Sequence, residues 1–384
     1  MRPPRAGEAP SDARDMGPDD TALLIIDRDA VAANYRALRA LASPAECGAV
    51  VKADAYGLGM AQLAPTLWQA GCRTFFVATL DEGESLRACL PEATIYVLSG
   101  LMPETGPLYR EHSLRPVLNS ADEVMEWASF CQAAGERLPC AVHIDTGMNR
   151  LGLSADEVDR IANAPGLWPA LTLSLVMSHL ACADEPGHAK NEAQRKLFDR
   201  LRVALPQAPA SFANSPGILL GPAYCHDLVR PGLALYGGHP RGRGDNPFRP
   251  VVTLMGRVLR VRDAAPGETV GYGATRSFRE ATRLAIVSVG YADGFFRSLS
   301  VADGEEGSAG YFGPHPAPIV GRVSMDLVVL DVSRVPAELA RRGALVELIG
   351  PNVPAHMLAA HAGTIDYEVL TNLGRRALRR YVGG

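Results

Sequence analysis

The sequence predicts an α/β protein in which an N-terminal (β/α)8 barrel of the TIM type is followed by a mainly-β C-terminal domain. Two observations lead to this fold class. From residue 22 onward, eight short apolar runs rich in β-branched residues alternate with helix-length amphipathic stretches, and eight strands close such a barrel. After the Gly-, Pro- and Arg-rich stretch 239–250, strand-like runs follow with little helix before residue 355. An open, doubly wound sheet stays possible for the first domain, because a strand count does not show closure.

The expected elements can be placed in order along the chain. The expected barrel strands are 48–53, 75–79, 95–99, 114–118, 140–145, 171–178, 209–213 and 228–236. Helices are expected over 30–42, 120–134 and 187–204, and the second begins at Ser120, with Glu123 completing a capping box. The expected strands of the second domain are 251–261, 269–272, 283–291, 318–332 and 344–349. The predicted division is a disordered tail over 1–21, the barrel over 22–242 and the β-domain over 243–384.

Composition and charge exclude several classes of function. The 384 residues include 38 basic and 42 acidic side chains, so no large positive field is available to hold nucleic acid or an anionic membrane. No apolar run approaches the roughly 18 residues that span a bilayer, and the first residues lack the apolar core of a secretion signal. The 7 cysteines lie apart without a C-x-x-C pair, which is typical of free thiols. We expect a cytoplasmic protein that acts on a small molecule and has no metal site.

Lysine is scarce in this chain. It occurs only as Lys52, Lys190 and Lys196, and every other basic residue is arginine. Lys52 ends the first expected strand behind two valines, so its stem is flanked by apolar surface. A desolvated lysine loses affinity for its proton and becomes a nucleophile toward carbonyl groups. Lys52 is therefore the candidate for amine chemistry.

Polar residues follow the ends of several expected strands. In a parallel barrel these carboxyl ends form the face that carries the active site. Taken singly, each such residue more often has a structural role, but here several converge: Lys52, Asp145, Asn149, Arg150, His179, Asn214 and Ser215, with Arg230 inside the eighth expected strand. Glycine-containing turns at 57–59, 215–217 and 231–232 add backbone N–H groups of the kind that bind phosphate. The expected ligand is a phosphorylated carbonyl compound.

Nine short motifs resemble those of a known family. They are VVKADAYGLG (50–59), HIDTGMNRLG (143–152), MSHLACADE (177–185), FANS (212–215), DLVRPGLALYG (227–237), VGYGA (270–274), VGYADG (289–294), IVGRVSMD (319–326) and TIDYE (364–368). Together they resemble the alanine racemases, pyridoxal-phosphate enzymes that have an N-terminal barrel and a C-terminal β-domain. The resemblance extends in order from residue 22 to the C-terminus.

The resemblance implies racemisation of alanine by two bases. Lys52 would hold pyridoxal 5'-phosphate covalently and then act as one base. Tyr272 would be the other base and would reach the site from the second subunit of a homodimer. A proton must leave one face of the substrate and return on the opposite face, so two groups on opposite sides are the minimum. A hydrogen-bond chain through His179 and Arg230 would help to stabilise the tyrosinate.

The resemblance also implies the contacts of cofactor and substrate. Arg230 would donate a hydrogen bond to the pyridine nitrogen without protonating it, which weakens the cofactor as an electron sink and suppresses transamination. Arg150 would contact the phenolic oxygen of the cofactor and the substrate carboxylate, which the backbone N–H of Met325 from the partner subunit would also bind. The implied phosphate contacts are Tyr56, Ser215, Gly232, Leu233 and Tyr367. The implied access corridor, narrow enough to favour alanine, is lined by Asp184, Tyr291, Arg297, Arg322 and Ile365.

One position departs from the pattern of the family. Many members have a carbamylated lysine where this chain has His143, and that negative group orients the arginine that corresponds to Arg150. Histidine cannot form the same carbamate. We therefore expect neutral His143 or a bound chloride ion to supply the missing acceptor.

Other functions stay open at this point. A broad-specificity, serine or basic amino-acid racemase on the same framework would differ in its corridor. A decarboxylase would place a carboxylate on the pyridine nitrogen, where this chain has Arg230. A non-catalytic carrier of pyridoxal phosphate would need neither Tyr272 nor Met325 nor the β-domain. The favoured expectation is an alanine racemase that supplies D-alanine for peptidoglycan, with a catabolic role as the open alternative.

Overall fold

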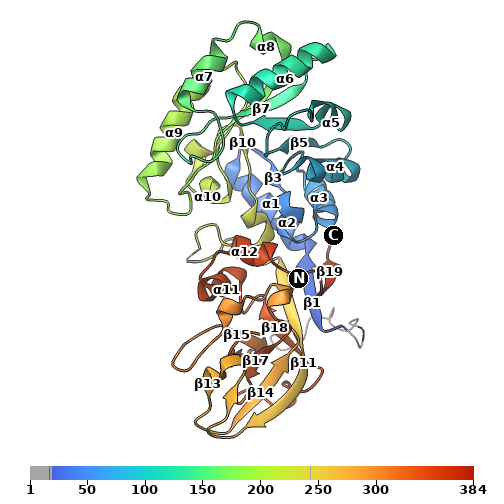
Figure 1. Cartoon of the computed structure of the whole chain (residues 1–384), viewed down its shortest axis with the longest axis vertical. Coiled ribbons are helices and arrows are strands. Elements are labelled where there is room, and N and C mark those ends of the chain that lie inside the picture. The colour runs from blue at the N-terminus through green and yellow to red at the C-terminus, as the bar shows by residue number, and fades with distance from the viewer. Residues whose placement is uncertain (1–16, 18–19, 243) are drawn as a thin grey trace. The chain divides into compact units, whose positions relative to one another are not determined.

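The structure is a computed structural model that describes residue 17 and residues 20–242 and 244–384 (Figure 1). Backbone contacts divide the chain into a barrel unit, residues 31–249, and a β-unit, which combines the residues up to 30 with 250–384. Most of the predicted tail 1–21 lies outside the described residues. The division differs from the predicted bounds 22–242 and 243–384, because β1 (Ala22–Asp27) pairs antiparallel with β11 (Val252–Ala264) and parallel with β19 (Leu378–Val382).

The barrel unit is a closed parallel sheet. Its strands are β2 (Glu46–Cys47), β3 (Ala49–Val50), β4 (Thr74–Val77), β5 (Thr94–Val97), β6 (Arg115–Leu118), β7 (Pro139–His143), β8 (Thr172–Met177), β9 (Ala210–Ser211) and β10 (Leu228–Val229). They follow the order β2-β10-β9-β8-β7-β6-β5-β4-β3. Only Gly48 separates β2 from β3, so one extended segment bonds to β10 on one side and to β4 on the other. The expected barrel of eight strand positions is confirmed, and an open sheet is excluded.

Gly48 makes this closure possible. Its N–H donates to the carbonyl of Val229 at 2.9 Å. A Cβ at this position would lie 3.0 Å from the carbonyl oxygen of Thr74 and 3.3 Å from that of Val229. The close approach of three backbone segments therefore favours a residue without a side chain.

Helices alternate with the barrel strands (Figure 1). They are α1 (Arg28–Ala42), α2 (Lys52–Tyr56), α3 (Met60–Gln69), α4 (Leu80–Cys89), α5 (Gly106–Glu111), α6 (Ala121–Ala134), α7 (Ala155–Ala162), α8 (Leu167–Ala170), α9 (Ala189–Arg202), α10 (Ser215–Ile218) and the 3-10 helix η2 (Pro222–Tyr224). Ser120 caps α6 as expected, because its Oγ accepts from the N–H of Glu123 at 3.2 Å. The predicted capping box is wrong: Glu123 Oε2 instead accepts from the backbone N–H groups of Asn119 at 3.0 Å and Leu101 at 3.1 Å. These loop donors compete successfully for the carboxylate.

The β-unit is mainly β, as predicted. Besides β1, β11 and β19 it contains β12 (Thr269–Val270), β13 (Arg276–Ser277), β14 (Thr282–Val287), β15 (Ala309–Phe312), β16 (His315–Pro318), β17 (Val328–Asp331) and β18 (Leu345–Ile349). The main sheet has the order β16-β15-β18-β11-β1-β19, while β14 pairs with β11 and β17 pairs with β14. The expected strand 318–332 is two strands, β16 and β17, because residues 319–327 form only isolated bridges, such as that of Ile319 with Leu330, and otherwise irregular backbone. The helices α11 (Ala355–Ala362) and α12 (Asp366–Thr371) follow β18.

The described residues contain neither a membrane-spanning helix nor a cluster of metal ligands. No helix there is long and apolar enough to cross a membrane. No group of three or more His, Cys, Asp or Glu side chains there could hold a metal ion. All seven cysteines are free thiols, and Cys47, Cys72, Cys131, Cys140 and Cys225 are buried.

Candidate active site

Lys52 lies at the carboxyl end of the first barrel strand and begins α2. The four residues that follow it, 53–56, have φ between 53° and 57°, in the left-handed region. Left-handed backbone costs roughly 1–2 kcal/mol per non-glycine residue, so the surroundings must support this turn. The N–H of Ala53 donates to Glu82 Oε1 at 2.6 Å, and the N–H of Met60 donates to Asp54 Oδ1 at 2.7 Å. The turn therefore fixes the backbone from which the Lys52 side chain leaves.

Lys52 has the lysine amine best suited to act as a base or a nucleophile. Burial lowers its pKa and the positive charge of Arg150 lowers it further, whereas the carboxylate of Glu82 acts in the opposite direction. The side chain of Lys196, by contrast, is 72 % exposed and lies 3.5 Å from Glu192 Oε1. A lowered pKa leaves a larger share of the Lys52 amine uncharged at neutral pH, as proton abstraction and carbonyl attack both require.

Arg230 is buried, and only neutral acceptors hold its guanidinium. Nη1 donates to Ser211 Oγ at 2.6 Å, and Nη2 donates to the carbonyl oxygen of Ser178 at 2.7 Å and to His179 Nδ1 at 3.3 Å. Burial lowers the pKa of Arg230 to about 9, which keeps the guanidinium protonated at neutral pH. The Nε–H group of Arg230 has no acceptor among the described residues.

His179 is a neutral imidazole of defined tautomer. Arginine can only donate, so His179 Nδ1 must accept from Arg230 and the ring proton must lie on Nε2. Burial and the charge of Arg230 hold the pKa of His179 well below its usual value. The link between His179 and Arg230 that the sequence motifs suggested is thus present in the barrel unit.

Ser215, Gly232 and Tyr56 form a compact polar cradle. Ser215 Oγ accepts hydrogen bonds from the N–H groups of Gly232 at 3.0 Å and of Ala234 at 3.2 Å, and the hydroxyl proton of Ser215 remains to donate. A Cβ on Gly232 would lie 2.7 Å from Tyr56 Cζ and closer still to the tyrosine oxygen. Leu233 is buried and begins the 3-10 helix η3 (Leu233–Tyr236). Only glycine at position 232 allows the tyrosine hydroxyl so close to the backbone.

Arg150 lies in an ordered loop after β7. Asp145 Oδ1 organises this loop by accepting from the N–H groups of Gly147 and Met148, both at 2.9 Å. Gly152 has φ 106°, and a Cβ there would lie 2.7 Å from the backbone nitrogen of Asp145. Arg150 itself is exposed and has no ion pair within the described part of the chain. The loop therefore presents an unneutralised guanidinium.

His143 is also neutral, and its neighbour sets its tautomer. Asn119 Nδ2 donates to the carbonyl oxygens of Val117 at 2.8 Å and Leu98 at 3.2 Å, so Asn119 Oδ1 is an acceptor. Oδ1 lies 2.8 Å from His143 Nδ1, which must carry the proton. Burial and the charge of Arg230 lower the pKa of His143 to about 4. His143 Nε2 is therefore left as a hydrogen-bond acceptor.

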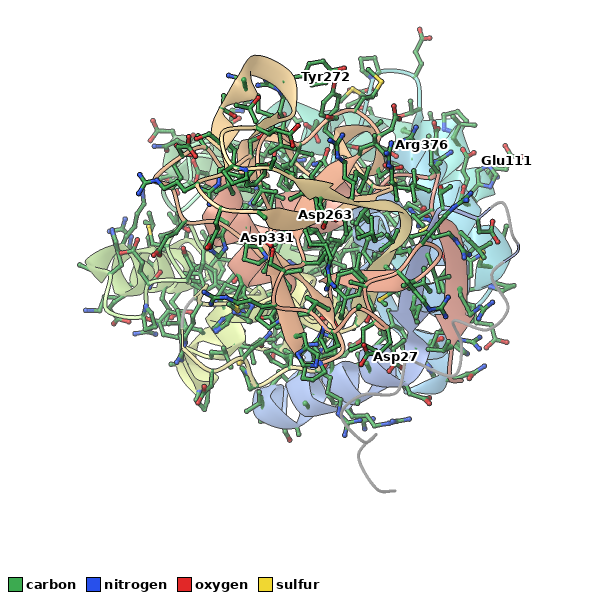
Figure 2. The ribbon with its side chains drawn as sticks, turned by 90° about the horizontal axis from the view of Figure 1, so that it is seen from below. Asp27, Glu111, Asp263, Tyr272, Asp331 and Arg376 are labelled. Carbon is green, nitrogen blue, oxygen red and sulfur yellow. The ribbon has the colours of Figure 1, made fainter. Side chains whose placement is uncertain are left out.

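The β-unit carries Tyr272, on the loop between β12 and β13 (Figure 2). Tyr272 begins the 3-10 helix η4 (Tyr272–Ala274) and is 71 % exposed. The guanidinium of Arg322 lies beside this loop, because a Cβ on Gly273 would be 2.9 Å from Arg322 Nη1. Two predicted residues, a base and a corridor residue, are thus neighbours.

Met325 and Tyr291 are also neighbours in the β-unit. The N–H of Tyr291, the first residue of η5 (Tyr291–Asp293), donates to the carbonyl oxygen of the residue before Met325 at 3.0 Å. Arg376, labelled in Figure 2, pairs with Asp293 at 2.8 Å and with Asp326 at 2.6 Å. These ion pairs hold the loops of Tyr291 and Met325 together, and both side chains remain exposed.

The other predicted residues are distributed over both units. Tyr367 is half-buried in α12, whose N-cap is the exposed Ile365, and Arg297 is exposed in η6 (Arg297–Leu299). Asp184 is exposed in the loop after β8 of the barrel unit. Within the barrel unit the charges of Lys52, Arg150 and Arg230 all act on His179, which places these predicted residues together.

Sequence reasoning missed three supporting residues: Glu82, Asn119 and Ser211. Glu82 follows the α4 N-cap and looked like an ordinary acidic residue of a first helical turn. Asn119 precedes the α6 N-cap, and Ser211 lies inside a short strand. The bonds that link them to the site, Glu82 to Ala53, Asn119 to His143 and Ser211 to Arg230, span at least 19 residues along the chain, so no local motif indicates these bonds.

Comparisons with known proteins match both units. The alanine racemase N-terminal domain matches residues 26–240, and the alanine racemase C-terminal domain matches residues 251–381. A protein of Methylobacterium sp. (strain 4-46) named alanine racemase is 52 % identical over 94 % of this chain and 98 % of its own length. One of Mesorhizobium japonicum, named alanine racemase, catabolic, is 46 % identical over 94 % of both chains. The crystal structure of Bartonella henselae alanine racemase with covalently bound pyridoxal phosphate has a TM-score of 0.89 and 40 % identity, and covers 94 % of this chain and 99 % of that one.

The barrel, the mainly-β unit and the lysine-centred rim define a class of amino-acid isomerases that depend on pyridoxal phosphate. Both domains match over nearly the whole chain, and relatives of about half-identical sequence share one name. The chain belongs to the alanine racemase family.

Proposed function

We propose that this protein interconverts L-alanine and D-alanine with pyridoxal 5'-phosphate, using Lys52 and Tyr272 as its two bases. The observation that carries the proposal is the position of Lys52 at the barrel rim, where it begins the left-handed turn 53–56 and where burial and Arg150 both lower the pKa of its amine. Such an amine can bind a carbonyl group covalently and can take up a proton near neutral pH.

The residues of the rim fit pyridoxal phosphate. Ser215 has a hydroxyl proton to donate, and the space beside Gly232 accommodates the Tyr56 hydroxyl, so this cradle suits a phosphate group. The Nε–H of buried Arg230 has no acceptor in the part of the chain that the structure describes and suits an aromatic nitrogen. When bound, the cofactor supplies an electron sink that makes the Cα proton of an amino acid acidic. Arg230 keeps its own proton, which favours proton return over transamination.

Tyr272 and Met325 support a homodimer with shared sites. Both belong to the large apolar or aromatic residues that this chain leaves exposed, as do Tyr291 and Ile365. Exposed groups of this kind are typical of surfaces that another chain covers. In the proposed dimer, Tyr272 from the partner subunit acts on the face of the substrate opposite Lys52, and symmetry gives two equivalent sites.

His143 is proposed as the acceptor that orients Arg150. The Asn119 amide leaves Nε2 of the imidazole as an acceptor, and the low pKa keeps the ring neutral. A bound chloride ion is the alternative. Anomalous scattering from a halide-soaked crystal distinguishes them: a halide peak between His143 and Arg150 overturns the assignment to neutral histidine.

The corridor residues Asp184, Tyr291, Arg297, Arg322 and Ile365 are proposed to favour a small substrate such as alanine, in a cytoplasmic enzyme. We further propose that the D-alanine serves peptidoglycan synthesis. A catabolic role is the alternative, because the Mesorhizobium japonicum relative of this chain is named alanine racemase, catabolic. Racemisation rates measured with serine, lysine and arginine test the alternative of a broad-specificity, serine or basic amino-acid racemase.

The decisive experiment incubates the purified protein with pyridoxal phosphate and L-alanine in heavy water. The expected product is D-alanine with deuterium at Cα, seen by chiral chromatography and mass spectrometry. Lys52→Ala abolishes it, whereas Lys196→Ala, a change at an exposed lysine, does not. Full activity of Lys52→Ala contradicts the proposal. Cofactor binding without any racemised amino acid favours the carrier.

A further inference from the structure

Glu82 joins two elements of the barrel rim through a single carboxylate. Its Oε1 accepts from the N–H of Ala53 at 2.6 Å, directly after Lys52. Its Oε2 accepts from the N–H of Ala78 at 2.7 Å, directly after β4. Hydrogen bonds to a charged acceptor are about twice as strong as neutral ones. The carboxylate thus ties the Lys52 turn to the end of the neighbouring strand.

The turn needs such a tie because its backbone is unfavourable. Residues 53–56 are all left-handed, and none of them is glycine. In addition, the N–H of Ala53 has no other acceptor among the described residues, so the loss of Glu82 leaves it unpaired. Without this support, the segment would lower its free energy by returning to right-handed or extended backbone. Either change rotates the backbone at Lys52.

The same carboxylate also acts on the Lys52 amine. Glu82 is the anionic group that raises the pKa of Lys52, against burial and the charge of Arg150. Glu82 therefore contacts the backbone of the turn and influences its functional group. Asp81, the preceding acid in the first turn of α4, makes no hydrogen bond or ion pair with the described residues of the Lys52 turn.

We propose that Glu82 is a positioning residue for the racemase reaction, which holds the left-handed turn 53–56 and thereby fixes the direction in which the Lys52 side chain enters the barrel rim. This inference rests on the proposed function, because it assigns the role of Glu82 through the role of Lys52. Glu82 itself does not touch substrate or cofactor in this scheme.

The test compares Glu82→Gln with Asp81→Asn in the full-length, cofactor-loaded protein. Glutamine has one acceptor oxygen and can keep only one of the two hydrogen bonds, while the asparagine variant controls for the lost charge in the same helical turn. Amide hydrogen exchange, read by mass spectrometry, should accelerate about tenfold or more in the peptide that covers 52–59 in Glu82→Gln, and not in Asp81→Asn. The kcat should fall about tenfold, with a smaller change in the KM for alanine.

A second variant separates positioning from electrostatics. Ala53→Gly relieves the left-handed cost at the first residue of the turn, because glycine adopts positive φ freely. It should recover part of the kcat lost in Glu82→Gln, although the carboxylate stays absent. Thermal melting checks that each variant folds.

Two results overturn the inference. One is exchange in the 52–59 peptide of Glu82→Gln that equals exchange in Asp81→Asn. The other is accelerated exchange with unchanged kcat and unchanged cofactor retention, which would make the turn irrelevant to the reaction. The failure of the proposed function is recognised separately, because the wild-type protein would then form no deuterated D-alanine, or Lys52→Ala would form it at the wild-type rate, whatever Glu82 does.

Discussion

Replacing Gly232 by alanine tests the phosphate cradle most directly. Gly232 has φ −131°, outside the left-handed region, and the main effect of the change is the contact of the new Cβ with Tyr56. The new Cβ would lie 2.7 Å from Tyr56 Cζ and closer still to the hydroxyl oxygen, whereas real Cβ contacts essentially never fall below 3.0 Å. The tyrosine must therefore move away from the position in which its hydroxyl can meet a phosphate.

The magnitude follows from the cost of overpacking. Inserting a methyl group into a filled space costs about 1–3 kcal/mol, and 1.4 kcal/mol corresponds to a factor of ten in affinity. The Kd for pyridoxal phosphate should therefore rise roughly 5- to 150-fold in Gly232→Ala. Gly187→Ala is the matched control, because a Cβ there meets nothing within 4 Å. Absorbance or fluorescence titration of the cofactor-free protein measures the Kd.

A double-mutant cycle with Tyr56→Phe identifies the cause. Phenylalanine removes the hydroxyl oxygen but keeps the ring carbon at 2.7 Å, so the penalty of Gly232→Ala should shrink on this background without vanishing. The reasoning is refuted if Gly232→Ala binds the cofactor as tightly as Gly187→Ala does. It is also refuted if the penalty is the same with tyrosine and with phenylalanine.

Three further outcomes are expected. Ser211→Ala removes the acceptor 2.6 Å from Arg230 Nη1, so kcat should fall several-fold and transamination to pyruvate should become measurable; a kcat equal to that of wild type contradicts the orienting role. The pKa of His143 is lowered to about 4, so the unfolded chain binds more protons between that pH and its ordinary value near 6.5. Stability should therefore decline as pH falls through this window, and denaturant unfolding of His143→Gln should show a smaller decline; an equal decline excludes His143 as the cause. Specific activity should drop on dilution, in step with dimer dissociation measured by sedimentation, if Tyr272 acts across the subunit interface; constant activity in a demonstrated monomer excludes this.

Local periodicity predicts the barrel well because each strand and its helix are neighbours along the chain. The N-cap at Ser120 depends on a pattern of only four residues, 120–123, and the structure contains the predicted hydrogen bond. The partners of β1 are remote: Ala22 pairs with Gly256, and Leu23 pairs with Leu378. No pattern within 22–27 indicates which sheet the strand joins, so its place in the β-unit could not be predicted.

The candidate site divides in the same way. Lys52, Arg150, His179, Ser215 and Arg230 follow strand ends, where barrel geometry directs attention. The residues that orient them follow no such rule, because a carboxylate or an amide binds a donor that is close in space, and the sequence does not show which donors are close. Glu123 illustrates the point: the local rule assigned it to Ser120, but the N–H groups of loop residues 101 and 119 bind it instead.

The charges of the rim make one last prediction about Lys52. Arg150 lowers the pKa of Lys52 and has no ion pair among the described residues, so no carboxylate paired with Arg150 offsets its charge. Arg150→Gln should therefore raise the pKa of Lys52, because the ammonium form loses a repulsive neighbour. With only three lysines in the chain, pH-dependent labelling by an amine reagent and peptide mass spectrometry can follow Lys52 in cofactor-free protein, with exposed Lys196 as the internal reference for the reagent. The labelling midpoint of Lys52 should move to higher pH in the variant. An unchanged or lower midpoint would show that Arg150 does not lower the pKa of this amine and serves ligand binding only.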